Sequence, residues 1–196
     1  MRKLTLVTTA ILAGMLAACG AESSAPVETQ PTPTPEASSK TEPFEAKSVT
    51  ANVIDVEGNS VGLLEVFSAP EGLLLRVSLT AGAIQPGWHG IHLHQVPDCS
   101  DVGEFKLSGG HVGKVSGGHG LLNPAGPEGG DMPNIYATIE GAANAEIFTP
   151  FISMSALEDN GGFAMIIHEG PDDHITQPIG GAGARVACAA VQFETE

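Results

Sequence analysis

The sequence is poor in basic side chains. Only eight of its 196 residues are lysine or arginine, whereas 23 are aspartate or glutamate, so the formal net charge is −15. Nucleic acids and anionic membrane surfaces bind proteins through positive charge, so this balance argues against both as direct partners. An acidic surface also repels small anions at long range, which makes each of the few basic residues informative.

Helical patterning is also missing. No stretch carries apolar residues at helical spacing over three turns, whereas several short segments alternate apolar and polar residues between turn-forming ones. The segments predicted as strands are 49–56, 61–67, 73–79, 88–95, 135–140, 145–148, 163–168 and 185–192. About eight short strands separated by turns predict an all-β fold, an antiparallel sandwich or barrel.

The N-terminal apolar run, residues 4–18, is too short to span a membrane comfortably. It follows Met-Arg-Lys and ends in Leu-Ala-Ala-Cys at 16–19, which is typical of a secretory signal. The last four residues resemble the bacterial lipobox, so we expect Cys19 to be acylated and to become the new N-terminus. An ordinary signal peptide with an incidental cysteine is the alternative.

Residues 20–47 lack the apolar content that a core needs. They are largely Ala, Glu, Ser, Pro and Thr, and predict a disordered, solvated tether. Residues 48–196 are long enough for one domain with a core. Loss of Arg2 and Lys3 with the signal at 1–19 would leave six basic side chains against 23 acidic ones, a net charge of −17.

Cysteine is scarce as well, with three in the chain. If Cys19 carries lipid, Cys99 and Cys188 form an even pair, and a disulfide between them is expected in an exported, oxidising compartment. The bridge would close a long loop, which the chain-entropy model values at about 4–5 kcal/mol before any native strain. Two free buried thiols are the alternative.

Histidine is the informative residue type. Three of the seven lie in Gly-Trp-His-Gly-Ile-His-Leu-His at 87–94. His92 and His94 stand at i and i+2 of one strand, so they share a face and can bind one ion, whereas His89 has the other parity. The remaining four lie downstream, at His111, His119, His168 and His174. Such a cluster predicts a metal site on a β scaffold, and hydrogen-bonded core or surface histidines are the alternative.

The segment 97–134 is long, rich in Gly and Pro, and poor in apolar runs. Loops of this length inside a compact domain are usually functional or disordered. This one carries several side chains that can bridge or bind metal, namely Cys99, His111, His119, Glu128 and Asp131. We therefore predict that it is functional and held in place.

With these residues assembled, the chain resembles bacterial secreted copper/zinc superoxide dismutases. The resemblance covers most of residues 85–190, while 48–84 match in strand pattern only. The matching stretches are Gly-Trp-His-Gly-Ile-His-Leu-His (87–94), Ser-Gly-Gly-His (108–111), His-Gly-Leu-Leu-Asn-Pro (119–124), Gly-Asp-Met-Pro-Asn (130–134), Ile-Ile-His-Glu-Gly-Pro-Asp-Asp (166–173) and Gly-Ala-Gly-Ala-Arg-Val-Ala-Cys (181–188). The family implies an eight-stranded Greek-key β sandwich or barrel with long metal-binding and electrostatic loops.

The resemblance also implies a set of metal ligands. Copper would be held by four imidazoles, those of His92, His94, His111 and His168. His111 would bridge copper and zinc and take part in catalysis. Zinc would be held by His111, His119 and Asp131.

The fourth zinc position departs from the family, which has a histidine three residues before the aspartate. This chain has Glu128 there, and glutamate is a legitimate zinc ligand. Three arrangements stay open: Glu128 binds zinc, water or His174 fills the gap, or the site is weak and often empty. The loop path after His111 is also expected to differ, because Val112-Gly113-Lys114 replaces the family's Phe-Asn-Pro.

Three further residues match positions beside the metals. Asp172 resembles the carboxylate that links a copper histidine to a zinc histidine, here expected to be His92 and His119. Arg185 resembles the arginine beside the open copper face, where a guanidinium can bind a small anion. His89 resembles a structural histidine bound to backbone.

The implied activity is the disproportionation of superoxide to dioxygen and hydrogen peroxide at a cycling copper centre, with zinc as the second cofactor. A copper-storing or copper-delivering lipoprotein on the same scaffold is the alternative. We expect a lipid-anchored protein of the bacterial cell envelope, on the outer membrane and facing the periplasm. Its membrane contact would run only through the N-terminal lipid, and a homodimer is compatible with the sequence.

Overall fold

The computed structural model describes residues 44–194. The signal peptide, the acylation of Cys19 and most of the tether were predicted for residues outside this range. Within it, no helix is long and apolar enough to cross a membrane.

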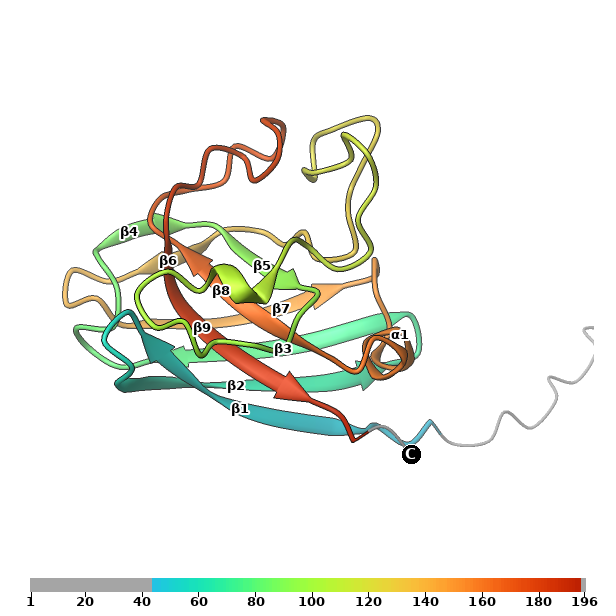
Figure 1. Ribbon diagram of the computed structural model, residues 1–196, viewed down its shortest axis with the longest axis horizontal. Coiled ribbons are helices and arrows are strands. Elements are labelled where there is room, and N and C mark those ends of the chain that lie inside the picture. Colours follow the sequence, from blue (N-terminus) through green and yellow to red (C-terminus); the bar gives the residue numbers. More distant parts are fainter. Residues whose placement is uncertain (1–43, 195–196) are drawn as a thin grey trace, which may run out of the picture. The chain divides into compact units, whose positions relative to one another are not determined.

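The architecture is an antiparallel seven-stranded sheet with a second sheet of two strands (Figure 1). The seven strands are β5 (Ile91–His94), β8 (Gly162–His168), β9 (Arg185–Gln192), β1 (Ser48–Asp55), β2 (Ser60–Ala69), β3 (Gly72–Leu79) and β7 (Ala143–Thr149), in spatial order. The small sheet pairs β4 (Gly87–His89) with β6 (Ile135–Ala137). The predicted all-β antiparallel fold is confirmed.

The predicted strand at 88–95 is divided in two, because Gly90 leaves the ladder between β4 and β5. Its amide donates to the Gly170 carbonyl at 2.8 Å, and its carbonyl accepts from the His168 amide at 2.8 Å. The break turns the single predicted strand into two. The two helices, α1 (Met154–Asp159) and the 3₁₀ turn η1 (Lys106–Ser108), are too short to give a periodic signal.

The core lies against one face of β5, and the histidines lie on the other. Ile91 and Leu93 are fully buried in the main apolar cluster, while His92 and His94 point the opposite way, as their spacing predicted. All seven residues of β8 are buried, because its outer face is covered by the part of the long loop that begins at Cys99 and carries Phe105, here called the disulfide loop. Phe105 of that loop packs there against Ala164, Ile166 and Cys188.

The predicted disulfide between Cys99 and Cys188 is present. It joins residues 89 apart in sequence, with Cα atoms 6.0 Å apart. The bridge ties the start of the long loop to β9, and the loop then returns along the outer edge of β5.

The long loop 97–134 takes the place of a neighbouring strand along this edge. Single bridges pair His94 with His111 and His92 with Asp131. The amide of Leu93 donates to the Gly130 carbonyl at 3.0 Å, and its carbonyl accepts from Val112 at 2.9 Å. The upper part of this loop and the segment at 170–184 rise on the same side of the sheet (Figure 1).

Candidate metal centre

Five of the seven histidines meet in one buried cluster beside β5. Their side chains come from β5, from the end of β8 and from the long loop, and each residue is at most 3% exposed. Ring centroids are as close as 4.3 Å for His92 and His111, and 4.9 Å for His92 and His168. The members are His92, His94, His111, His119 and His168.

The polar atoms at the centre of this cluster have no partner. Among residues 44–194, His92 Nδ1, His94 Nε2, His168 Nε2 and both ring nitrogens of His111 are buried without a hydrogen bond. Ligand atoms of His92, His94 and His168 lie within 4.8 Å of one another. Buried unpartnered nitrogens are costly, so the convergence of His92, His94 and His168 is evidence for an ion between them, and the two free nitrogens of His111 can face one ion on each side of its ring.

In His94 and His168, the ring nitrogen that faces away from the centre is fixed by an acceptor. His94 Nδ1 lies 2.9 Å from the Gly109 carbonyl, and His168 Nδ1 lies 3.1 Å from the Gly183 carbonyl. A carbonyl oxygen can only accept, so each of these nitrogens carries the proton. The opposite nitrogen, Nε2 in both rings, therefore presents its lone pair to the centre.

Burial keeps the same three histidines neutral. It lowers the pKa of His92 to about 4, of His94 to about 2 and of His168 to about 3. Neighbouring rings reinforce the effect, and the charge of Arg185 adds to it at His94 and His168. Neutral imidazole is the form that binds metal, so these three rings can act as ligands at neutral pH.

A second ligand group lies on the far side of His111. Its Nδ1 lies 2.9 Å from Glu128 Oε2 and 3.1 Å from Asp131 Oδ1, and His119 Nδ1 lies 2.8 Å from the same Asp131 oxygen. Burial opposes ionisation of Asp131, but the close His111 ring and the amides of Gly120 and Glu128 outweigh it and lower its pKa to about 2. Two imidazoles and two carboxylates form a set that suits zinc.

Asp172 connects the two groups as the sequence predicted. Its Oδ2 lies 2.8 Å from His92 Nε2, and its Oδ1 lies 3.2 Å from His119 Nε2. Burial opposes its ionisation, but these rings and the His174 amide lower its pKa below the ordinary range of a carboxyl. The side chain of Asn134 fixes the backbone of Asp172 through two hydrogen bonds. Asn134 Nδ2 donates to the Asp172 carbonyl, and the Asp172 amide donates to Asn134 Oδ1.

The other two histidines lie outside both groups. His89 binds two backbone carbonyls, those of His168 and Gln85, at 2.7 Å each. His174 lies beside Asp172, with its Nδ1 3.4 Å from Oδ2, and its Nε2 lies 3.3 Å from the Asn134 amide. It therefore faces the linking carboxylate rather than Glu128.

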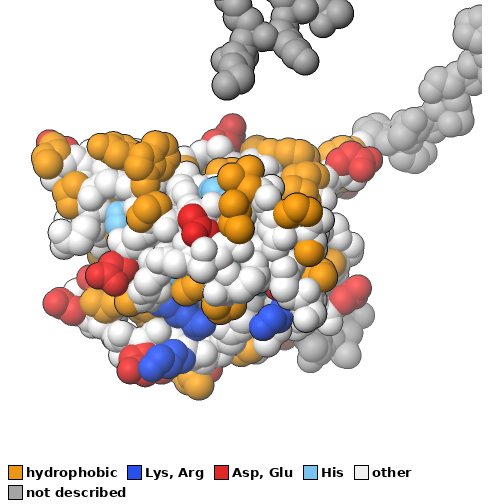
Figure 2. Space-filling model, turned by 90° about the horizontal axis from the view of Figure 1, so that it is seen from above, with side chains coloured by type: hydrophobic (Ala, Val, Ile, Leu, Met, Phe, Trp, Pro, Cys, Tyr) orange, Lys and Arg blue, Asp and Glu red, His pale blue; other side chains and the backbone are white. Residues whose placement is uncertain are grey.

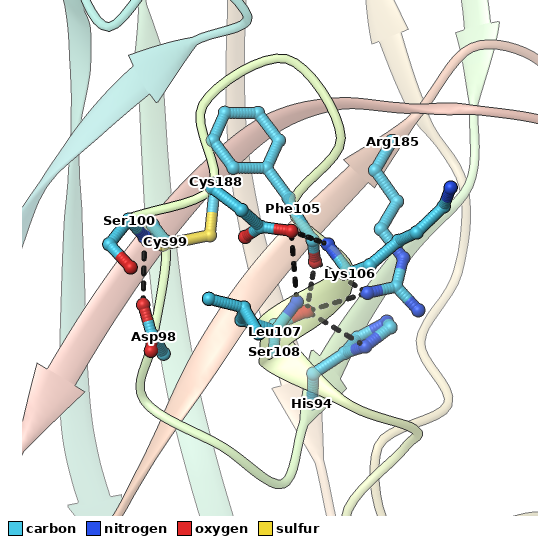
Figure 3. The surroundings of a disulfide bond; sticks show 11 residues. His94, Asp98, Cys99, Ser100, Phe105, Lys106, Leu107, Ser108, Arg185 and Cys188 are labelled. Atoms are coloured by element: carbon cyan, nitrogen blue, oxygen red, sulfur yellow. Dashed lines mark hydrogen bonds between the residues drawn. A yellow bond between two sulfur atoms is a disulfide. The ribbon is translucent and has the colours of Figure 1, made fainter.

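Arg185 lies beside the part of the disulfide loop that carries Phe105 and Ser108 (Figure 3). Its Nη1 donates to the Phe105 carbonyl at 2.5 Å and to Ser108 Oγ at 2.9 Å, and its Nη2 donates to the Gly109 carbonyl at 2.8 Å. Ser108 Oγ lies 3.3 Å from His94 Nδ1, so the guanidinium is joined to a ring of the cluster. On the face that carries the long loops, the basic side chains in view lie in one half of the molecule (Figure 2).

Sequence reasoning missed the groups that hold the site residues in place. Gln177 clamps the backbone of His119 from both sides, accepting from its amide at 3.2 Å and donating to its carbonyl at 2.8 Å. Asn134 holds the backbone of Asp172 in the same way, and Ser108 Oγ accepts a hydrogen bond from the Arg185 guanidinium. Ser108 and Asn134 stand in the quoted stretches 108–111 and 130–134, which is the only signal the sequence offered.

Known proteins resemble this chain in sequence and in fold. The family model for copper/zinc superoxide dismutase (SODC) matches residues 61–191. The Cu-Zn superoxide dismutase of Caulobacter vibrioides is 45% identical over 152 residues, which is 74% of this chain and 86% of that protein. The Cu/Zn superoxide dismutase structure from Brucella abortus superposes with a TM-score of 0.62 at 28% identity, over 74% of this chain and 100% of that one. The structure of a SOD-like protein from Bacillus subtilis superposes with a TM-score of 0.65 at 31% identity, over 72% of this chain and 96% of that one.

Proposed function

Because this chain belongs to the copper/zinc superoxide dismutase family, we propose that it disproportionates superoxide to dioxygen and hydrogen peroxide at a copper ion held by its unpartnered imidazoles. The ligand atoms would be His92 Nδ1, His94 Nε2, His111 Nε2 and His168 Nε2. A zinc ion would share His111 through Nδ1 and would also bind His119 and Asp131. When bound, copper supplies the one-electron acceptor and donor that the reaction needs, and four imidazoles suit it.

The chain's own residues orient the histidine rings and attract the anionic substrate. Asp172 holds His92 and His119 at once, which fixes the relative position of the two metal sites. Three N–H groups of Arg185 are used within the protein, which leaves two of its five without an acceptor among the described residues. Those two can bind a small anion such as superoxide and raise its concentration at the site.

The observation that carries this proposal is the set of converging, buried, unpartnered imidazole nitrogens. It is tested by His168→Ala, with copper content and dismutase activity measured on the same sample and the fold checked by circular dichroism. We expect an intact fold, less bound copper and no activity. Full activity in the variant would refute the copper assignment. Wild-type protein that binds copper without turning over superoxide would instead favour storage or delivery.

We further propose that the protein is a lipoprotein of the cell envelope, attached to the outer membrane and facing the periplasm. Support comes from the lipobox-like Leu-Ala-Ala-Cys at 16–19 and from the Cys99–Cys188 disulfide, a bond that persists in oxidising compartments. Mass spectrometry of the N-terminal peptide and membrane fractionation test it. Cys19→Ser should release the protein from the membrane fraction, and an unchanged distribution would refute the anchor.

We also propose that two copies associate through β4 and β6. Trp88 and Tyr136 form an edge-to-face pair there, with centroids 5.1 Å apart, although they are 57% and 56% exposed. Exposed aromatic side chains are enriched at protein interfaces. Two copies with a net charge of −15 each repel one another, so their association needs an apolar contact such as this pair. Sedimentation should give a dimer for the wild type and a monomer for Trp88→Glu, and a monomeric wild type would refute the association.

A further inference from the structure

Glu128 is a buried carboxylate where the family resemblance places a histidine. Only 3% of the residue is exposed, and Oε2 lies 2.9 Å from His111 Nδ1. Burying a carboxylate is costly unless a partner or an ion compensates its charge. The partner has to be found in its immediate surroundings.

The backbone fixes the position of this carboxylate. The amide of Gly130 donates to the Val112 carbonyl at 3.0 Å, and that of Gly129 donates to the Gly113 carbonyl at 3.3 Å. This short ladder brings the turn that carries Glu128 against the segment that follows His111. The second carboxylate oxygen, Oε1, accepts a hydrogen bond from the Val115 amide at 3.3 Å. Oε2 is therefore directed towards His111.

His111 Nδ1 lies between two carboxylate oxygens and still makes no hydrogen bond. Glu128 Oε2 is 2.9 Å away and Asp131 Oδ1 is 3.1 Å away, yet neither lies in the direction of a hydrogen bond from this nitrogen. Ligand atoms around a four-coordinate zinc point at the ion rather than at each other and are about 3.3 Å apart. The two separations from His111 Nδ1 are close to that value. The residues whose ligand atoms all lie within 4.8 Å of one another are His92, His111, His119 and Asp131, so Glu128 would have to turn towards them to complete the set. His174 lies elsewhere, beside Asp172.

We propose that Glu128 is the fourth ligand of the zinc position and that it makes this position bind copper less tightly than a histidine there would. The inference rests on the proposed function, because it takes His111 as shared between the two ions. Imidazole suits copper, whereas carboxylate oxygen suits harder ions, so a carboxylate in place of an imidazole lowers the affinity of the position for copper. With Glu128 the zinc position has two imidazoles and two carboxylates, so copper added alone fills the four-imidazole position first.

The first experiment measures zinc affinity rather than activity. Metal-free protein is loaded with one equivalent of copper, and zinc binding is followed by competition with a chelator. Glu128→Gln keeps the shape and the acceptor for Val115, so we expect it to fold normally and to bind zinc at least about tenfold more weakly. Glu140→Gln, an exposed carboxylate with the same change of charge, is the matched control and should bind zinc as the wild type does. Equal zinc affinity in Glu128→Gln and the wild type would overturn the ligand assignment.

The second experiment tests discrimination between the metals. Metal-free wild type and Glu128→His are each given two equivalents of Cu²⁺, and retained copper is measured by mass spectrometry and electron paramagnetic resonance. We expect the second copper, which has a distinct spectrum, to be retained more weakly by the wild type than by Glu128→His. Two coppers retained equally by both proteins would refute the discrimination.

The outcomes separate this inference from the proposed function. Wild-type protein that binds no copper, or binds it without activity, contradicts the proposed dismutase reaction. Wild-type protein that is active with one copper, while Glu128→Gln keeps full zinc affinity, contradicts only the role of Glu128.

Discussion

At the scale of single residues, the ring nitrogen that faces the centre of the cluster is set, in His94 and His168, by what the other nitrogen of the ring meets. The sequence indicated which histidines belong to the cluster, through the spacing of His92 and His94 and through motifs further along. It could not indicate which ring nitrogen faces inward. That choice depends on the carbonyls of Gly109 and Gly183, each 15 residues from the histidine it binds, and therefore on the fold.

Arg185→Ala should slow the reaction and flatten its dependence on salt. The side chain is a partly buried cation near His94 and His168, and two of its N–H groups have no acceptor among the described residues. Attraction by such a cation raises anion encounter rates by about tenfold or more. The rate constant is measured by rapid mixing with superoxide over a range of ionic strength. Arg185→Lys is the control, since it keeps the charge but not the fork-shaped hydrogen bonds, and it should retain the salt dependence at a lower rate. An unchanged rate in Arg185→Ala would remove the proposed role.

At the scale of elements, the site depends on the loop 97–134, which pairs with the edge of β5 through backbone hydrogen bonds as a strand would. The histidine and cysteine content of 97–134 was enough to predict that the loop is functional and held in place. Its path was not predictable, because the contacts that hold it to β5 are made by backbone groups of Leu93, Val112 and Gly130. Backbone pairing between segments far apart leaves no pattern in the side chains. The same holds for the break at Gly90, which is caused by pairing with residues 168–170.

Gly130→Ala should displace the loop from β5 and destabilise the fold. A Cβ at this position would lie 2.2 Å from the Leu93 carbonyl oxygen and 3.3 Å from the His111 Cβ, and neither group can move freely. We expect a loss of about 1–3 kcal/mol in the free energy of unfolding together with weaker metal binding. Gly110→Ala is the matched control, because its added Cβ would meet only Lys114 Nζ at 3.7 Å. Urea denaturation of both metal-free variants gives the comparison, and equal stability would show that the loop can shift without cost.

At the scale of the whole molecule, the acidic chain brings five histidines from distant segments into one buried cluster. The fold class was predictable from short segments in which apolar and polar residues alternate, because one face of each strand packs against the core. The neutral state of His92, His94 and His168 did not follow from the sequence. It arises from their burial, which only the complete fold produces.

Acid should therefore destabilise the metal-free protein. In the folded chain the pKa values of His92, His94 and His168 are about 4, 2 and 3, against an ordinary value of 6.5. Below pH 6.5 the unfolded chain binds more protons than the folded one, so stability falls as the pH drops towards 4. Each of the three histidines contributes up to about 1.4 kcal/mol per pH unit.

The lowered pKa of Asp131, about 2 against 3.8, adds a loss of the same sign only below pH 4, so the histidines dominate between pH 6.5 and 4. Urea denaturation of metal-free protein at pH 7, 6 and 5 measures the slope. His168→Ala removes one of the three neutral rings, so its stability should fall less steeply over the same range. Equal stability of the wild type at pH 7 and 5 would mean that the buried rings accept protons without unfolding, and that the cluster is not held in its metal-binding form by burial.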